Sequence, residues 1–194
     1  MTLTITQGNI TYSETDAIVN AANDRLAEGG GVCGAIFGAV AKLGGRDGHR
    51  QLTEACRAIG HCPTGDAAIT PSFGLKAGFI IHAVGPDWNG RKGRDLVAPL
   101  TDRELKQVDE LASAYSAVIR VCKENNIRSV TIPGIGTGIY EFPENIAAIV
   151  ATQICENEAG DLDITLIAYQ DSSLVTLKAA PSADGLALLN GHQF

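Results

Sequence analysis

The residues best suited to chemistry in this sequence are glycines. A Gly-Gly-Gly run at 29–31 follows the motif Asn-Ala-Ala-Asn at 20–23 and precedes Val32 and Cys33. Glycine adopts positive φ angles and allows a ligand to approach the main chain closely. If a helix begins after this run, its free N–H groups provide a positive end that suits a phosphate. The alternative interpretation is a plain glycine-rich turn.

A second glycine loop favours the first of these interpretations. Residues 134–140, Gly-Ile-Gly-Thr-Gly-Ile-Tyr, follow the apolar segment SVTIP at 129–133. Successive backbone amides of such a loop can bind an anion, and Thr137 can add a hydroxyl donor. The loop has neither the Gly-Lys-Ser/Thr of a P-loop nor the glycine spacing of a dinucleotide-binding fingerprint. Two loops that each suit one phosphate suggest a diphosphate ligand.

The segments around the loops must position them. Strand patterns occur at 3–10, 15–23, 67–73, 78–86, 128–136 and 163–171. Helical spacing of apolar residues occurs at 32–43, 48–60, 100–124 and 143–156. This alternation predicts an α/β fold in which a largely parallel sheet is covered on both faces. Ligands of such folds bind beyond the carboxyl ends of the strands, where both loops are expected.

Composition limits the classes of protein to consider. The chain has 194 residues with 45% hydrophobic content, so we expect one domain with one sizeable core. No apolar run approaches the roughly 20 residues of a membrane helix, and the N-terminus lacks a signal-peptide pattern, so a cytoplasmic protein is expected. Its five irregularly spaced cysteines predict reduced thiols. The net charge of −7 argues against duplex nucleic acid as a partner.

Four ordered blocks of the sequence resemble the macrodomain family. They are NITYSETDAIVNAAND at 9–24, GGGVCGAI at 29–36, CPTGDAAITPSFGLKAGFIIHAVGP at 62–86 and SVTIPGIGTGIYEFP at 129–143. The resemblance extends over residues 7–169 and is strongest to the branch of ADP-ribosyl hydrolases and O-acetyl-ADP-ribose deacetylases. It implies one macrodomain over residues 1–194, a three-layer α/β/α fold with a mixed central sheet, and ADP-ribose, free or attached to protein, as the ligand. It implies no cofactor.

The resemblance also implies where the ligand lies. The diphosphate would lie between the two glycine loops, which contribute Gly30, Gly31, Val32, Gly136, Thr137, Gly138, Ile139 and Tyr140. Tyr140 would pack against the distal ribose, and Asn23 would bind a hydroxyl of that ribose. Asn9 and Ile10 would lie at the adenine. Tyr169 either stacks on the adenine, a contact worth roughly 1–3 kcal/mol, or closes the core at the end of the last strand.

Two positions depart from the family pattern. Asn9 stands where the family usually has an aspartate that accepts from the exocyclic amine of adenine. Asn9 can still accept through its carbonyl, but the bond is neutral. Cys33 stands where the hydrolase branch often has an aspartate, which puts a carboxylate-assisted reaction in doubt. Asn23 and, with less support, Cys33 are the candidate catalytic residues.

Other residues favour simple structural roles. His82 lies within an apolar strand and is expected to be buried with its polar atoms satisfied, rather than paired with Cys33 as a nucleophile. Cys56, His61 and Cys62 lack a fourth ligand at a recognisable spacing, so no metal site is predicted. Arg91, Lys92 and Arg94 are expected in a solvated loop; contact with an attached protein or nucleotide chain is the alternative. Two segments, 87–99 and the tail from about 179, have no clear pattern.

Three functions remain to be weighed. The first is a hydrolase that releases ADP-ribose from protein, or acetyl from O-acetyl-ADP-ribose, with a water held between the substrate's phosphate and its distal ribose. The second is a reader module that binds ADP-ribose without reaction. The third, a nucleotide-dependent oxidoreductase, is disfavoured because the fingerprint is absent. The sequence favours the hydrolase over the reader.

Overall fold

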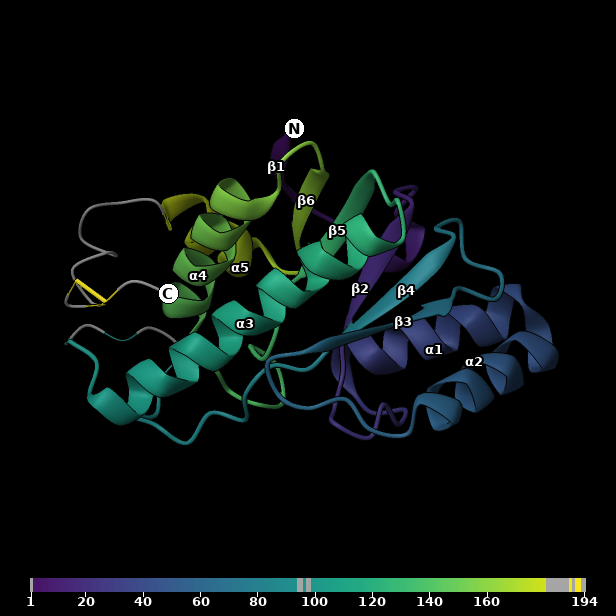
Figure 1. The fold of residues 1–194 in the computed structure, drawn as a ribbon, viewed down its shortest axis with the longest axis horizontal. Helices are drawn as coiled ribbons and strands as arrows, with labels where there is room; N and C mark the ends of the chain where they lie inside the picture. Colours follow the sequence, from purple (N-terminus) through teal and green to yellow (C-terminus); the bar gives the residue numbers. More distant parts are fainter. Residues whose placement is uncertain (1, 94–95, 97–98, 181–188, 190, 193–194) are drawn as a thin grey trace.

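A computed structural model describes residues 2–93, 96, 99–180, 189 and 191–192 of the chain (Figure 1). Arg94 and most of the tail from 179 onward lie outside the described residues, as does part of the 87–99 segment. The strands are β1 (Leu3–Gln7), β2 (Ala17–Ala21), β3 (Ala67–Pro71), β4 (Phe79–Ala83), β5 (Ser129–Pro133) and β6 (Asp163–Ala168). The helices are η1 (Ile10–Tyr12), α1 (Gly31–Leu43), α2 (Gly45–Ile59), α3 (Asp102–Glu124), α4 (Glu144–Glu158) and α5 (Asp171–Ala179).

The strands form one mixed sheet in the order β1-β6-β5-β2-β4-β3. All neighbouring strands are parallel except β3, which pairs antiparallel with β4. The carboxyl ends of the parallel strands therefore lie at one edge of the sheet. This arrangement confirms the predicted α/β/α fold with a mixed central sheet.

Alternation along the central strands sends side chains into two separate cores. In β2, Ala17 and Val19 pack with the buried faces of α3 and α4, while Ile18 packs with α1 and α2. In β4, Ile81 and Ile80 divide in the same way. Helices thus cover both faces of the sheet (Figure 1). The central strands β2 and β4 are almost entirely apolar.

The first strand is shorter than its alternating pattern predicts. Residues 3–10 were expected to be extended, but β1 ends at Gln7 and η1 begins at Ile10. The reason is Asn9, whose side-chain oxygen accepts from the Thr11 N–H at 3.0 Å and from the Thr11 hydroxyl at 2.8 Å. An asparagine that caps in this way competes with strand pairing.

The sequence patterns also missed α5. None of its residues is buried, so its apolar side chains show no helical stripe. The helix nevertheless lies beside α4 and the β1–β6 end of the sheet (Figure 1). Among the described residues, no helix combines the length and the apolar character needed to cross a membrane.

Candidate ligand-binding site

A cleft of about 730 Å³ opens at the carboxyl ends of β2, β5 and β6. This volume is within the usual range for small-molecule sites. The structure brings every predicted site residue into the lining of this cleft: Asn9, Ile10, Asn23, Gly30, Gly31, Val32, Cys33, Gly136, Thr137, Gly138, Ile139, Tyr140 and Tyr169.

The first glycine loop leads directly into α1. Gly30 is the N-cap of this helix and has no side chain with which to cap it, while Gly31 adopts φ +60°, a conformation that favours glycine. The first N–H groups of α1 therefore lie at the cleft with no side-chain acceptor supplied by the cap. They provide the positive end expected of an anion site.

The second glycine loop lies across the cleft from the first. Gly136 adopts φ +76°, and the Phe142 N–H donates to the Gly136 carbonyl at 3.0 Å. The loops approach each other closely, because a Cβ added at Gly30 would lie 3.1 Å from Cδ1 of Ile139. The Ile139 side chain thus lies against the first loop, and the backbone of both loops lines the cleft.

The charge of the cleft lining differs from that of most phosphate sites. Among the described residues that line it, Glu144 is the only one with a charged side chain. An anion here would depend on oriented backbone N–H groups and the α1 terminus rather than on lysine or arginine. This agrees with the low number of basic residues in the chain.

Asn23 is held by its own loop. Its Nδ2 donates to the Ala27 carbonyl at 2.8 Å, and its Oδ1 accepts from the N–H groups of Arg25 and Ala27 at 3.2 and 3.0 Å. Nδ2 has a second hydrogen that can serve a ligand. Asn23 is therefore positioned by the 23–27 turn that it stabilises.

Cys33 is buried and linked to polar groups on two sides. Its Sγ lies 3.6 Å from Nδ2 of Asn20 and 3.8 Å from the carbonyl of Ala27. The same Asn20 Nδ2 lies 3.1 Å from Nδ1 of His82, so Asn20 separates the thiol from the imidazole. The expected burial of His82 is confirmed, since it is 0% exposed and its Nε2 contacts the Thr70 hydroxyl at 3.0 Å. A Cys33–His82 nucleophilic pair is not formed.

Two aromatic residues at the cleft differ in their surroundings. Tyr169 is 78% exposed, which excludes the alternative that it closes the core. Burial raises the pKa of the Tyr140 hydroxyl, and the nearby carboxylates of Asp24 and Asp87 raise it further. Tyr140 therefore stays protonated at neutral pH and can donate a hydrogen bond.

The sequence patterns missed several residues of the cleft. Tyr115 of α3 accepts a 3.3 Å hydrogen bond from the Ile135 N–H and so supports the second glycine loop from below. Further lining comes from one face of α4 and from α5: Ala147, Ala148, Ala151, Ser173, Thr176 and Leu177. The helical period of α4 could have indicated its inward face, but α5 has no such signal.

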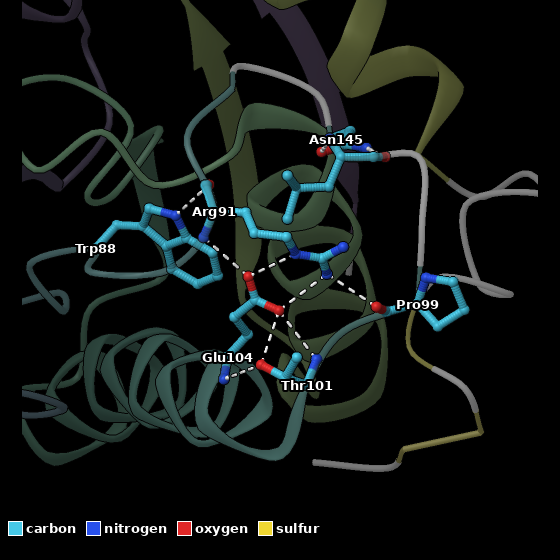
Figure 2. Close-up of polar contacts among 7 residues, drawn as sticks. Trp88, Arg91, Pro99, Thr101, Glu104 and Asn145 are labelled. Atoms are coloured by element: carbon cyan, nitrogen blue, oxygen red, sulfur yellow. Dashed lines mark hydrogen bonds and ion pairs between the residues drawn. The ribbon is translucent and has the colours of Figure 1, made fainter.

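The prediction of a solvated basic loop is confirmed for Arg91, whose side chain is 41% exposed, but this residue is also paired with a buried carboxylate (Figure 2). Its guanidinium forms an ion pair with Glu104 at 2.9 Å, and the Glu104 side chain is only 3% exposed. Arg91 also donates to the Pro99 carbonyl at 2.8 Å. Lys92 forms an ion pair with Glu141 and remains on the surface. Among the described residues there is no cluster of side chains that could hold a metal ion.

Comparison with known proteins places this architecture in a family. The family described as Macro domain matches residues 19–151. The Macro domain-containing protein RSc0334 of Ralstonia nicotianae is 41% identical over 163 residues, with 84% of each chain covered. The Macro domain-containing protein lmo2759 of Listeria monocytogenes is 42% identical over 151 residues, covering 78% of this chain and 77% of that protein.

Solved structures agree with this result. The Oceanobacillus iheyensis macrodomain with ADP has a TM-score of 0.73 and 30% identity, covering 90% of this chain and 86% of that one. The Trypanosoma brucei macrodomain in complex with ADP-ribose has a TM-score of 0.74 and 28% identity, covering 93% of this chain and 69% of that one. The chain belongs to the macrodomain family.

Proposed function

We propose that this macrodomain binds ADP-ribose and hydrolyses its linkage to modified protein, or removes acetyl from O-acetyl-ADP-ribose. The observation that carries the proposal is the cleft itself, in which two glycine loops and the N-terminus of α1 surround a space that no described lysine or arginine lines. Such a site suits a diphosphate. The ADP and ADP-ribose complexes of the similar macrodomains support this choice of ligand.

The proposed orientation of the ligand follows from the positions of the lining residues. The diphosphate lies along the backbone of the two glycine loops, which line the same cleft. The adenine lies toward Asn9 and the exposed ring of Tyr169, at the carboxyl ends of β1 and β6. The distal ribose lies toward Asn23 and the protonated hydroxyl of Tyr140.

The chemistry has to be assigned to few side chains. The position after Val32 holds a thiol rather than a carboxylate, and that thiol contacts Asn20 and the Ala27 carbonyl. We therefore assign the water-activating role to the bound diphosphate. The water attacks C1 of the distal ribose, the bond from C1 to the oxygen of the modified carboxylate breaks, and the carboxylate leaves with the bonding electron pair. An oxygen of the diphosphate takes the proton of the water. The loops contribute by holding water, phosphate and ribose in a fixed geometry.

A reader module is the second candidate function. It is favoured by Cys33, because a thiol replaces the carboxylate that the hydrolase branch often has at this position. A reader would bind ADP-ribose on the same loops and release nothing from a modified protein. An oxidoreductase would instead bind NAD more tightly than ADP-ribose.

One experiment separates these functions. Calorimetry should give micromolar affinity for ADP-ribose, about −7 to −8 kcal/mol, with AMP and NAD weaker. The protein is then incubated with mono-ADP-ribosylated protein and with O-acetyl-ADP-ribose, and released ADP-ribose or acetate is measured. Binding without release supports the reader, while no heat with millimolar ADP-ribose refutes both proposals.

The proposed ligand indicates the partner of the protein, and the state of the cysteines bears on its location. We infer ADP-ribosylated protein as the partner, with neither duplex nucleic acid nor membrane, and a single macrodomain as the functional unit. We also propose a cytoplasmic location. All five cysteines are free thiols, which is consistent with a reducing compartment.

Substitution of Asn9 by aspartate should tighten ADP-ribose binding by about tenfold or less. One carboxylate oxygen can keep the cap on Thr11, and the other can accept from the exocyclic amine of adenine. A charge-assisted hydrogen bond exceeds a neutral one by roughly 1 kcal/mol. The inosine analogue of ADP-ribose lacks this amine and provides the control. Equal tightening for both ligands, or none for ADP-ribose, would place Asn9 away from the base.

Cys33→Ala should retain any hydrolase activity within about tenfold, or about 1.4 kcal/mol in the barrier. The thiol only tethers Asn20 and the 23–27 turn in this structure. Asn23→Ala should reduce kcat/KM further, because the turn and the distal ribose both lose a contact. Both variants are compared on one ADP-ribosylated substrate, with ADP-ribose affinity measured alongside. A thousandfold loss for Cys33→Ala at unchanged affinity would make Cys33 catalytic.

A further inference from the structure

The second glycine loop carries backbone strain where it leaves the cleft. Glu141, directly after Tyr140, adopts φ +53°, a conformation that is unusual for a residue with a side chain. Its N–H donates to the Gly138 carbonyl at 3.0 Å. Strained residues persist only where the surrounding structure fixes them. The contacts on either side of Glu141 therefore bear on the shape of the loop.

Trp88 holds the backbone on both sides of this strained residue. Its N–H donates to the Tyr140 carbonyl at 3.0 Å, and its indole packs edge-on against the Phe142 ring at a centroid distance of 4.8 Å. Trp88 is 4% exposed and does not line the cleft. It therefore lies directly behind the part of the loop that faces the ligand.

Trp88 is in turn held by Arg91 and Glu104 (Figure 2). The indole Nε1 donates to the Arg91 carbonyl at 2.9 Å. The Arg91 N–H and its Nε both donate to Oε1 of Glu104 at 2.9 Å, and its Nη2 donates to Oε2 at 2.9 Å. Thr101 adds its N–H and hydroxyl to Oε2, each at 2.9 Å. The Arg91 guanidinium is the main reason that the pKa of Glu104 falls to about 2, so this carboxylate is charged at neutral pH.

A second residue of α3 fixes the backbone beside Trp88. Nε2 of Gln107 donates to the Asp87 carbonyl at 2.7 Å, and its Oε1 accepts from the Asn89 N–H at 3.3 Å. Gln107 is 7% exposed. Space here is tight, since a Cβ at Gly90 would lie 2.3 Å from the Trp88 ring and 2.8 Å from Cγ of Glu104.

We infer that Trp88, Arg91, Glu104 and Gln107 form an anchoring network that positions the second glycine loop for the diphosphate and distal ribose. None of the four lines the cleft, so they are positioning residues and do not touch the ligand. The inference rests on the proposed function. The first glycine loop needs no such support, because it continues directly into α1. Loss of the network should therefore weaken contacts to the distal half of the ligand and spare the adenosine half.

The test compares two ligands on two variants. Glu104→Gln keeps the size of the side chain but loses the charge and points an amide group toward donors. Gln107→Leu removes only the bonds to Asp87 and Asn89. This variant tests the network on its own if Glu104→Gln fails to fold. ADP-ribose affinity should fall about tenfold in the first and a few-fold in the second. AMP reaches only the adenosine half and the nearer phosphate, and its affinity, measured by competition, should stay within about twofold of the unmodified protein.

Two control variants lie on the same helix. Arg120→Ala removes ion pairs to Asp66 and Glu124 at a distance from the loop. Val118→Ala truncates a fully buried side chain, so it lowers the stability of the fold without removing a bond of the network. Both controls should bind ADP-ribose and AMP as the unmodified protein does, at temperatures where all variants are folded.

Trp88 also gives a direct readout, because it is the only tryptophan in the chain. Its fluorescence should be poorly quenched by acrylamide in the unmodified protein and in both controls, and more strongly quenched in Glu104→Gln. Equal loss of ADP-ribose and AMP affinity, or full ADP-ribose affinity in both network variants, would overturn the inference.

Failure of the proposed function would be recognised separately. If the unmodified protein does not bind ADP-ribose, that proposal falls, and hydrogen exchange over residues 134–142 decides the inference instead. Faster exchange there in Glu104→Gln, but not in Val118→Ala, would support the network. Unchanged protection would overturn it.

Discussion

Gly138→Glu should abolish ADP-ribose binding, with an affinity loss of at least about 100-fold, or 2.7 kcal/mol. Gly138 lines the cleft, and a Cβ at this position would have no described atom within 4 Å, so the substitution should not disturb the fold. A carboxylate at about 4 Å from a phosphate meets repulsion of up to about 4 kcal/mol per charge pair near a protein surface. The described residues that line the cleft include no basic side chain that could offset this repulsion.

Gly138→Gln is the matched control, because glutamine has the same shape without the charge. It should lose less than about tenfold in affinity, and its free energy of unfolding should equal that of Gly138→Glu within about 0.5 kcal/mol. The defect of the glutamate variant should also shrink as salt is raised. Titration calorimetry at two ionic strengths measures the affinities, and urea unfolding measures the free energies of unfolding. If both variants bind ADP-ribose like the unmodified protein, the second loop is not the phosphate site.

The loops and the fold class could be predicted because their signals are local in the sequence. The second glycine loop follows its apolar strand directly and the first follows its strand after a short segment, so each loop is expected near the carboxyl end of a strand. The largely parallel pairing follows from the same alternation of strands and helices, but the order of the strands does not, and neither does the pairing of β3. Its antiparallel pairing with β4 has no counterpart in the periodicity, because parallel and antiparallel strands share the same two-residue repeat.

The anchoring network could not be predicted because its members are paired across the fold. Arg91 resembles a surface residue among polar neighbours, and only the three-dimensional structure brings it to Glu104. The sequence carries part of the signal, since Thr101 followed by Glu104 is the pattern of a capping box, which the structure contains. That pattern does not indicate that Glu104 also binds Arg91. The double role of Glu104, which caps α3 and also binds a loop residue, is recognisable only in the three-dimensional structure, where the helix and the loop lie side by side.

The buried polar cluster beside the cleft has a consequence for stability in acid. His82 is 0% exposed, and burial lowers its pKa from the ordinary 6.5 to about 4. Its Nδ1 faces the Nδ2 donor of Asn20, and its Nε2 faces the Thr70 hydroxyl and the Cys56 thiol. Burial raises the pKa of Cys56 to about 11, so that thiol stays neutral. No carboxylate among these partners compensates a charge on the imidazole.

The protein should therefore lose about 3 kcal/mol of unfolding free energy through His82 as the pH falls from 6.5 to about 4. Over this range the unfolded chain binds a proton that the folded imidazole does not, so acid favours unfolding, and above pH 6.5 the effect vanishes. Urea unfolding at pH 7.5, 6, 5 and 4.5 measures the slope. His82→Gln cannot titrate and should show a shallower slope over the same range, even if it is less stable at every pH.

Equal slopes in the two proteins would mean that the folded imidazole accepts the proton. That would require Asn20 to turn its oxygen, which is unpaired in the described structure, toward Nδ1 of His82. Because Asn20 also holds Cys33, that rotation would change the wall of the cleft as well as the stability of the fold.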